Sequence, residues 1–262
     1  MKLFLRISFL GTRYCGYQVQ KNAPSVQRVL NETAERVFGF PCDIVGCSRT
    51  DSGVHAEEFC VCVTKKGEQG METSIPVSRI PTAMNCFLPD DVSVLDANCV
   101  PEEFHARYDV KYKEYVYRIW NGSVKQPFLA DRMLFLPTPV TSEALARGNE
   151  AARAFVGKQD FHAFMASGSK ITDTVRTVYD ASLTKEGDVI TFRVAADGFL
   201  YHMVRIMVGT LIDVLMDKRT PREVEAVIDS RDRRCAGSTA PPHGLYLHRV
   251  SYEEYQIQGG KT

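Results

Sequence analysis

Two kinds of periodicity alternate along this chain of 262 residues, and their order limits the folds open to it. The stretch KYKEYVYRIW, residues 111–120, places alternate side chains on opposite faces, which is the period of a β-strand. The stretch SVQRVLNETAERVFG, residues 25–39, has the apolar spacing of an amphipathic helix, with Ser25 as its cap and Gly39 at its end. The elements follow the order βαββαβ and then βαββααβ, which predicts an α+β fold with mainly antiparallel sheets and helices on one face.

The similar order of elements in the two parts of the chain predicts two units. We expect an N-terminal α+β half at residues 1–105 and a C-terminal α+β half at residues 106–262. The second half is expected to contain a long apolar helix at residues 199–216 and a closing strand at residues 244–252.

Composition places the chain among ordinary globular proteins, with 44% apolar and 24% charged residues. No apolar run reaches the roughly 18 residues that a membrane span needs, so we expect no membrane partner. The opening stretch MKLFLRISFLGTRYCG is interrupted by Arg6 and lacks a small-residue cleavage site. We therefore interpret it as a strand that begins near Met1 rather than as a signal peptide.

The eight cysteines show no C-x-x-C pair. Cys60 and Cys62 alternate with apolar residues, as same-face residues of a strand do. This pattern favours reduced, packed cysteines in a cytoplasmic protein over a disulfide framework or a zinc site.

The formal charge is zero, with 32 basic and 32 acidic residues, which weighs slightly against a nucleic-acid partner. Local patches matter more than the total, however. Two basic clusters stand out: Arg107, Lys111, Lys113 and Arg118 form the first, and Arg231, Arg233 and Arg234 form the second.

The stretch GCSRTDSGVHA, residues 46–56, concentrates functional side chains in a turn between two predicted strands. Asp51 lies there with Gly53 two residues on, and glycine lets a backbone turn sharply and approach a ligand closely. Two interpretations remain open for Asp51. Its carboxylate either caps a backbone N–H in an Asx-turn or serves as a reactive group on a loop.

Arg205 lies within the apolar helix expected at residues 199–216, where a lone charge is costly. Its side chain either snorkels to the helix edge or pairs with a buried carboxylate, for which Asp51 is a candidate. His202 and Gly209 share its stripe, which predicts a close approach of another segment at Gly209.

Aromatic residues on the predicted strand at residues 111–120 stack on bases in some proteins and fill the core in others. Tyr115 and Tyr117 share one face of that strand, and Lys113 and Arg118 are positioned to suit phosphates. The sequence pattern alone leaves both interpretations open.

Taken together, these motifs resemble those of the tRNA pseudouridine synthase A family. GCSRTDSGVHA is similar to its G-R-T-D-A-G-V-H-A motif, although Ser48 and Ser52 replace a glycine and an alanine, and Tyr17 stands where many members have tryptophan. FHARYDVKYKEYVYRI, DFHAF with RTV, HMVRIMVG and GLYL resemble its later motifs, in the same order and at similar spacing. The similarity extends over nearly the whole chain.

The resemblance implies the pseudouridine synthase fold, in which two similar halves join across a central cleft with helices on the outer face. It implies an isomerase that converts uridine to pseudouridine at positions 38–40 of the tRNA anticodon stem-loop, without metal or cofactor, as a homodimer. It also implies residue roles, with the catalytic loop in the N-terminal half. These are Asp51 as the catalytic residue, Arg49 displacing the target base, Tyr115 stacking on the uracil, Arg205 pairing with the aspartate, and Leu245 lining the pocket. Tyr117 is the less good match to the stacking tyrosine, and we expect His55 to brace the loop.

Several alternatives stay open. The sequence is compatible with an aspartate that attacks the base, attacks C1′ or abstracts a ribose proton, and with a tRNA substrate or a paralogue that acts on ribosomal RNA. A metal-dependent hydrolase using Glu57 and Glu58 beside Asp51 is one rival. A non-catalytic RNA-binding module built on the tyrosine strand is the other.

Overall fold

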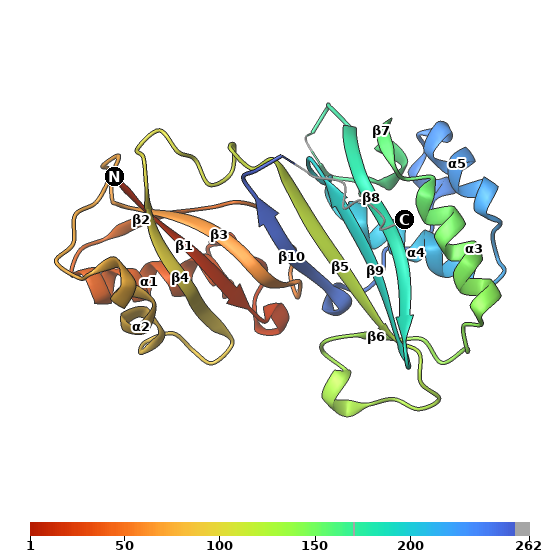
Figure 1. The fold of residues 1–262 in the computed structure, drawn as a ribbon, viewed down its shortest axis with the longest axis horizontal. Helices are drawn as coiled ribbons and strands as arrows, with labels where there is room; N and C mark the ends of the chain where they lie inside the picture. The colour runs from red at the N-terminus through yellow and green to blue at the C-terminus, as the bar shows by residue number, and fades with distance from the viewer. Residues whose placement is uncertain (170, 255–262) are drawn as a thin grey trace, which may run out of the picture. The chain divides into compact units, whose positions relative to one another are not determined.

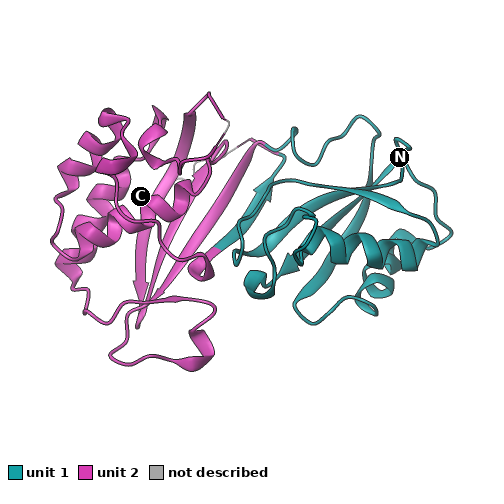
Figure 2. Cartoon of the chain, turned by 180° about the vertical axis from the view of Figure 1, so that it is seen from behind, with its two compact units in different colours: residues 1–110, 246–252 teal, residues 111–245, 253–262 magenta. Residues whose placement is uncertain are grey.

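The computed structural model describes residues 1–169 and 171–254, which form two compact units (Figure 2). Unit 1 consists of residues 1–110 and 246–252, and unit 2 of residues 111–245 with 253 and 254. The sequence-based division at residues 105 and 106 lies five residues before the first of these changes and does not include the return of the chain to unit 1.

Unit 1 is a sheet covered on one face by two helices (Figure 1). Strand β1 pairs antiparallel with both β3 and β4, β2 pairs antiparallel with β3, and β10 pairs parallel with β3. The strands are β1 (Lys2–Phe9), β2 (Cys42–Gly46), β3 (His55–Lys65), β4 (Val92–Val100) and β10 (Leu245–Ser251), of which only Leu245 is assigned to unit 2. The helices are α1 (Val26–Phe38) and α2 (Ile80–Asn85), with short 3-10 helices at Gly11–Arg13 and Val77–Arg79.

Alternate side chains of the unit 1 strands point to the same face of the sheet and form the core of unit 1. Leu5 and Ile7 of β1 are fully buried, and they stand opposite Val61 and Phe59 of β3, which are buried too. The first predicted helix is confirmed at both ends. The Ser25 hydroxyl accepts the backbone N–H of Arg28 at 3.4 Å, and Gly39 ends α1 with a left-handed φ of 79°.

Unit 2 is a sheet of antiparallel neighbours in the order β5-β9-β8-β7, with β6 added parallel to β5. Its helices lie on one side of the strands β8 and β9 (Figure 1). The strands are β5 (Tyr112–Trp120), β6 (Leu134–Phe135), β7 (Gly157–Asp160), β8 (Val175–Glu186) and β9 (Val189–Ala196). The helices are α3 (Ser142–Arg153), α4 (Met203–Leu215) and α5 (Pro221–Ser230), with 3-10 helices at Pro127–Leu129, His162–Phe164, Arg233–Cys235 and Pro242–Gly244.

The α+β class, the mainly antiparallel sheets and the helices on one face are therefore as predicted. One difference concerns α4, which begins at Met203 and not at residue 199. His202 has a left-handed φ of 60° and stands at the helix cap, so it does not share the helical stripe of Arg205 as the sequence pattern suggested.

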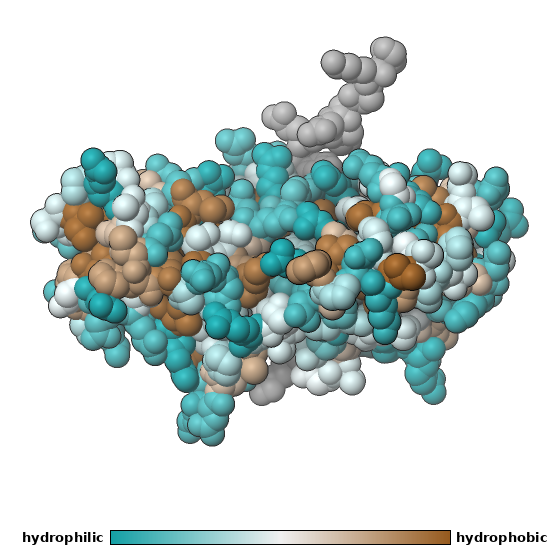
Figure 3. Space-filling view, turned by 90° about the horizontal axis from the view of Figure 1, so that it is seen from below, coloured by the Kyte–Doolittle hydropathy of each residue, from teal (hydrophilic) through white to brown (hydrophobic). Residues whose placement is uncertain are grey.

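Within residues 1–169 and 171–254, no helix is both long and apolar enough to cross a membrane. Apolar side chains form small patches among polar ones on the face shown in Figure 3. All eight cysteines are free thiols, and burial raises the pKa of the Cys60 and Cys62 thiols, which keeps them protonated and unreactive.

Candidate active site

Asp51 lies in the loop between β2 and β3, at residues 47–54, as the sequence predicts. The loop leaves the sheet at Cys47, whose N–H donates to the carbonyl of Cys60 at 2.8 Å, and closes where the N–H of Val54 donates to the carbonyl of Asp51 at 3.2 Å. Gly53 has a φ of 78°, a conformation that glycine adopts without strain. Asp51 is half-buried and Arg49 is exposed, so one compact turn presents both charges.

A second segment, residues 10–17, holds this loop by its backbone. The N–H of Gly53 donates to the carbonyl of Tyr14 at 3.2 Å, and the N–H of Tyr17 donates to the carbonyl of Thr50 at 3.4 Å. The Ser52 hydroxyl adds a bond to the same Tyr14 carbonyl at 3.3 Å. The residues on both sides of Asp51 are thereby fixed. We call residues 10–17 the loop-supporting segment.

Two glycines let the loop-supporting segment approach so closely. A Cβ atom on Gly16 falls 2.5 Å from the carbonyl oxygen of Thr50, and one on Gly11 falls 2.0 Å from that of Val54. Any larger residue at either position displaces the loop. Sequence reasoning missed this segment, although its two glycines were a visible signal of close backbone approach.

The loop-supporting segment is itself anchored at Asp91. Arg13 Nε donates to one carboxylate oxygen of Asp91 at 2.6 Å, the Tyr14 hydroxyl donates to the other at 2.7 Å, and the N–H of Leu10 donates to the Asp91 carbonyl at 2.9 Å. Burial, together with the bond to Asp91, raises the pKa of Tyr14 to about 12, so its hydroxyl stays a donor at neutral pH.

In unit 2, Arg205 lies in the first turn of α4, half-buried. Its Nε donates to the carbonyl oxygen of Ala240 at 2.7 Å, and the N–H of Ala240 donates to the carbonyl of Arg205 at 3.0 Å. This reciprocal pair fixes the direction of the guanidinium, which does not simply snorkel along the helix. The predicted close approach at Gly209 is confirmed, since a Cβ atom there falls 1.7 Å from the carbonyl oxygen of Ser238.

The two tyrosines of β5 differ in their surroundings. Tyr117 is fully buried, its hydroxyl donates to the carbonyl of Pro241 at 2.8 Å, and burial raises its pKa. Tyr115 is 7% exposed, and its ring meets that of Phe199 edge-on, with centroids 5.0 Å apart. Tyr117 therefore has the contacts of a core residue. Phe199, which the sequence analysis did not single out, is the aromatic neighbour of Tyr115.

The expected site residues thus fall into two groups. Unit 1 brings together Arg49 and Asp51 on one loop. Unit 2 holds Tyr115, Arg205 and the buried Leu245, which directly follows the 3-10 helix Pro242–Gly244. The pairing of Asp51 with Arg205 joins residues of different units and stays a prediction.

Comparison with known proteins identifies the family. The family model described as tRNA pseudouridine synthase matches residues 6–109 and 151–253. The chain belongs to the tRNA pseudouridine synthase family. Arg49, Asp51, Arg205 and Leu245 lie within the matched residues, whereas Tyr115 lies between the two matched segments.

Individual relatives in the tRNA pseudouridine synthase family extend over almost the full chain, and each is named tRNA pseudouridine synthase A. The protein of Thermoanaerobacter sp. (strain X514) is 42% identical over 246 residues, which cover 94% of this chain and 97% of that protein. The protein of Acetivibrio thermocellus is 41% identical, covering 95% and 98%, and that of Halalkalibacterium halodurans is 37% identical, covering 100% and 96%. A solved structure described as a Cbf5-Nop10-Gar1 complex aligns with 94% of this chain and 49% of that chain at 12% identity and a TM-score of 0.38, too low to support an argument.

Membership in the tRNA pseudouridine synthase family, a family of isomerases, agrees with the contacts of the two glutamates that follow the loop. Glu57 lies 2.5 Å from Nδ1 of His248, and Glu58 accepts the backbone N–H of Val250 at 3.0 Å. Both carboxylates tie β3 to β10 within unit 1. This arrangement argues against the rival interpretation in which they join Asp51 as metal ligands of a hydrolase.

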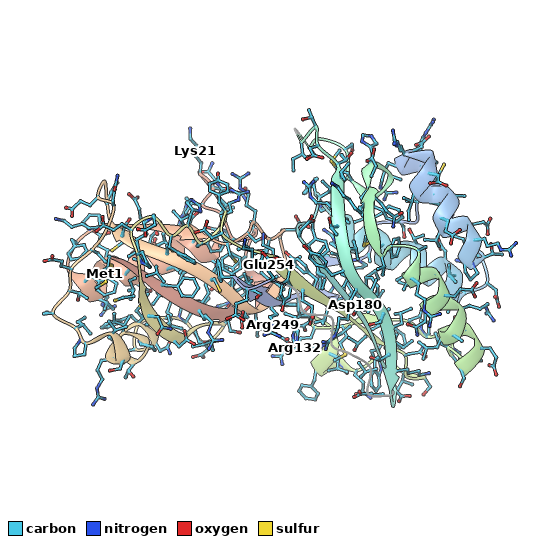
Figure 4. All side chains as sticks on the ribbon, turned by 45° about the horizontal axis from the view of Figure 1, so that its top comes forward. Met1, Lys21, Arg132, Asp180, Arg249 and Glu254 are labelled. Atoms are coloured by element: carbon cyan, nitrogen blue, oxygen red, sulfur yellow. The ribbon has the colours of Figure 1, made fainter. Side chains whose placement is uncertain are left out.

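The basic clusters noted in the sequence are partly neutralised on the surface. Three ion pairs involve them: Lys111 with Glu254 at 3.2 Å (Glu254 is labelled in Figure 4), Arg231 with Asp160 at 3.1 Å, and Arg234 with Asp232 at 2.6 Å. The basic side chains of these pairs are largely exposed to solvent, which weakens the pairs by screening.

Proposed function

We propose that this chain converts uridine to pseudouridine at positions 38–40 of the tRNA anticodon stem-loop, with Asp51 as its catalytic residue. The observation that carries the proposal is the loop at residues 47–54. A family-matched segment presents a half-buried carboxylate on a turn that the loop-supporting segment fixes on both sides. A reaction in which bonds break and form at one atom, C1′ of the ribose, requires a catalytic group that is held in a fixed position.

The reaction explains the need for a positioned carboxylate. The bond between N1 and C1′ of uridine breaks, the base turns, and C5 forms a bond to C1′. The hydrogen on C5 then leaves as a proton, and N1 takes up a proton, so the change is an isomerisation without net oxidation. Asp51 supplies the nucleophile that attacks the base or C1′, or the base that abstracts a ribose proton.

The other residues receive roles that suit their positions. The exposed Arg49 lies two residues from Asp51 and is proposed to occupy the space that the displaced base leaves. Tyr115 is proposed to stack on the uracil and Leu245 to line its pocket. Arg205, whose guanidinium is directed by Ala240, is proposed to pair with Asp51 and keep it ionised.

The test is tritium release from tRNA labelled at C5 of uridine, in a buffer without added metal, nucleotide or redox cofactor. Asp51→Asn is expected to abolish release while tRNA affinity stays within a few-fold of wild type, because asparagine is nearly isosteric but is neither nucleophile nor base. Asp43→Asn is the control, since Asp43 is an exposed carboxylate of unit 1 on β2. Sustained release by pure Asp51→Asn protein contradicts the assignment.

The substrate is tested separately. Pseudouridines are mapped in transfer and ribosomal RNA from cells with and without this protein, and we expect loss only at tRNA positions 38–40. Loss confined to ribosomal RNA contradicts the proposed substrate while leaving the chemistry intact. Cleaved RNA, or release that depends on metal, supports the hydrolase instead, and wild-type protein that binds RNA without any release supports the binding module.

The proposal also includes a homodimer in the cytoplasm. A single copy has a formal charge of zero, so a basic surface for tRNA is more readily built from two copies. Sedimentation equilibrium of the purified protein, with and without tRNA, tests this. A monomer that retains full turnover contradicts the dimer.

A further inference from the structure

We propose that His55 is a positioning residue for catalysis, which fixes the Asp51 loop through a neutral imidazole with its proton on Nε2. The inference rests on the proposed role of Asp51. It assigns to His55 no contact with the substrate. His55 acts through the loop-supporting segment and through Tyr246 of β10, both of which belong to the same unit as the loop.

The hydrogen bond of His55 determines its protonation. His55 is the first residue of β3, directly after the loop, and it is fully buried. Its Nδ1 lies 2.9 Å from the backbone N of Gly11, which can only donate. Nδ1 is therefore the acceptor and carries no proton, so the neutral ring bears its proton on Nε2.

The bond to Gly11 lies at the start of the loop-supporting segment. Gly11 begins the 3-10 helix Gly11–Arg13, and its backbone is in such close contact with Val54 that a Cβ atom there falls 2.0 Å from the Val54 carbonyl oxygen. Three and six residues later, Tyr14 and Tyr17 make the backbone bonds to the loop. One imidazole nitrogen thus fixes the end of the segment that orients Asp51.

The ring of His55 is held from a second direction. It lies against the ring of Tyr246, with centroids 4.6 Å apart and planes inclined by 30°, and the two residues are register partners of the parallel pair of β3 and β10. Tyr246 is itself 5% exposed. The imidazole therefore joins three segments that are distant in sequence, residues 10–17, 47–54 and 245–251.

This geometry separates a positioning role from proton transfer. A proton taken up at Nδ1 removes the bond to Gly11 and leaves a buried N–H without its acceptor. A residue that must stay neutral to hold the loop is poorly suited to exchange protons during turnover. The hydrogen-bond acceptor, rather than the titration of the ring, is then the property that catalysis needs.

Two variants separate the acceptor from the ring. His55→Phe keeps an aromatic ring against Tyr246 but offers no acceptor, whereas His55→Asn offers Oδ1 near the position of Nδ1 but no ring. In steady-state assays at saturating tRNA, His55→Phe is expected to lower kcat about 10- to 100-fold, since a misplacement of about 1 Å costs up to 100-fold. Its Kd for tRNA is expected to stay within about threefold of wild type, because the substrate-contacting residues are unchanged.

His55→Asn is expected to recover most of the lost rate and to keep the wild-type pH profile. Amide hydrogen exchange reports the same distinction, with residues 47–54 exchanging faster in His55→Phe than in wild type or His55→Asn. Should His55→Phe fail to fold, His55→Asn decides alone. A rate and pH profile like those of wild type support the proposal, and a rate as low as that of Asp51→Asn overturns it.

Other outcomes overturn it as well. The first is a folded His55→Phe protein with the wild-type kcat. The second is a His55→Phe protein that loses only tRNA affinity, and the third is a His55→Asn protein whose kcat is no higher than that of His55→Phe. A limb near pH 6.5 that is present in wild type and absent in His55→Asn identifies proton exchange instead. Asp51→Asn is assayed in parallel. If it is inactive while His55→Phe is unaffected, only this inference fails, and if it is active, the proposed function fails.

Discussion

Replacing Gly209 by alanine is expected to destabilise unit 2, although alanine is the better helix former. Gly209 is buried in α4, and a Cβ atom there falls 1.7 Å from the carbonyl oxygen of Ser238 and 2.8 Å from its carbonyl carbon. Both are backbone atoms, so no change of rotamer relieves the contact. The segment around Ser238 must move by about 1 Å or more, because close-packed interiors do not absorb such an overlap.

The movement breaks hydrogen bonds that hold residues 237–240 to α4. Thr210 Oγ1 accepts the N–H of Gly237 at 2.9 Å, and two bonds of 2.7 and 3.0 Å join Arg205 to Ala240. Overpacking costs about 1–3 kcal/mol, and each lost bond costs about 1 kcal/mol. Helix propensity offsets about 1 kcal/mol. With two bonds lost, the free energy of unfolding is expected to fall by about 2–4 kcal/mol.

Gly148→Ala is the matched control. Gly148 is a buried glycine of α3, where a Cβ atom falls 2.8 Å from the terminal methyl carbons of Leu183 and Leu215. These are ends of flexible side chains, which can adjust. The gain in helix propensity and the repacking cost are both about 1 kcal/mol, so the stability of Gly148→Ala is expected to stay near that of wild type.

Urea unfolding of the three proteins measures the difference, and tritium release measures its effect on function. Gly209→Ala is expected to lose turnover even where it remains folded, because Ala240 directs the guanidinium of Arg205. A Gly209→Ala protein as stable as Gly148→Ala would show that the contact with Ser238 carries no cost.

Three further predictions address the aromatic residues and the charge. Tyr17→Phe is expected to raise the free energy of unfolding by about 1 kcal/mol, because the buried Tyr17 hydroxyl has no hydrogen-bond partner among the described residues. Phenylalanine keeps the ring that stacks on Phe59, with centroids 4.4 Å apart. A lower stability of this variant in urea contradicts the prediction. Tyr115→Ala is expected to slow tritium release more than Tyr117→Phe, since a lost base contact costs roughly 1–3 kcal/mol whereas Tyr117→Phe keeps its ring and removes one bond to Pro241; a Tyr115→Ala protein that releases tritium as fast as Tyr117→Phe contradicts the stacking role of Tyr115. The logarithm of tRNA affinity is expected to fall linearly with the logarithm of salt concentration in filter-binding assays, despite the formal charge of zero; an affinity independent of salt argues against phosphate contacts.

Local signals in the sequence predicted the elements whose stability is local. The helix α1 was predicted from its cap, its apolar spacing and its terminal glycine, all of which the structure confirms. The loop around Asp51 was predicted because a run of turn-forming residues separates two alternating strands. The close approach at Gly209 was predicted because an arginine and a glycine on one stripe of an apolar helix need a neighbour.

The partners in contacts between distant backbone segments could not be predicted. The loop-supporting segment contains only the short 3-10 helix Gly11–Arg13 and has no periodicity of its own, and its bonds to the loop use backbone atoms whose partners no sequence pattern identifies. One partner of Arg205 is likewise a backbone carbonyl, that of Ala240. The closing strand was predicted, but not its parallel pairing with β3 across almost the whole sequence.

The same reliance on backbone atoms explains why two departures from the family motif leave the loop intact. Gly53, Thr50 and Val54 hold the loop through their N–H and carbonyl groups, so the side chain at position 52 is not needed for the fold of the turn. Ser52 is exposed, and its hydroxyl adds one bond to the carbonyl of Tyr14 that an alanine lacks. Ser48 lies between the buried Cys47 and the exposed Arg49, where the chain already faces solvent on one side. Variation at these two positions therefore changes the surface that the loop presents while Asp51 keeps its backbone support.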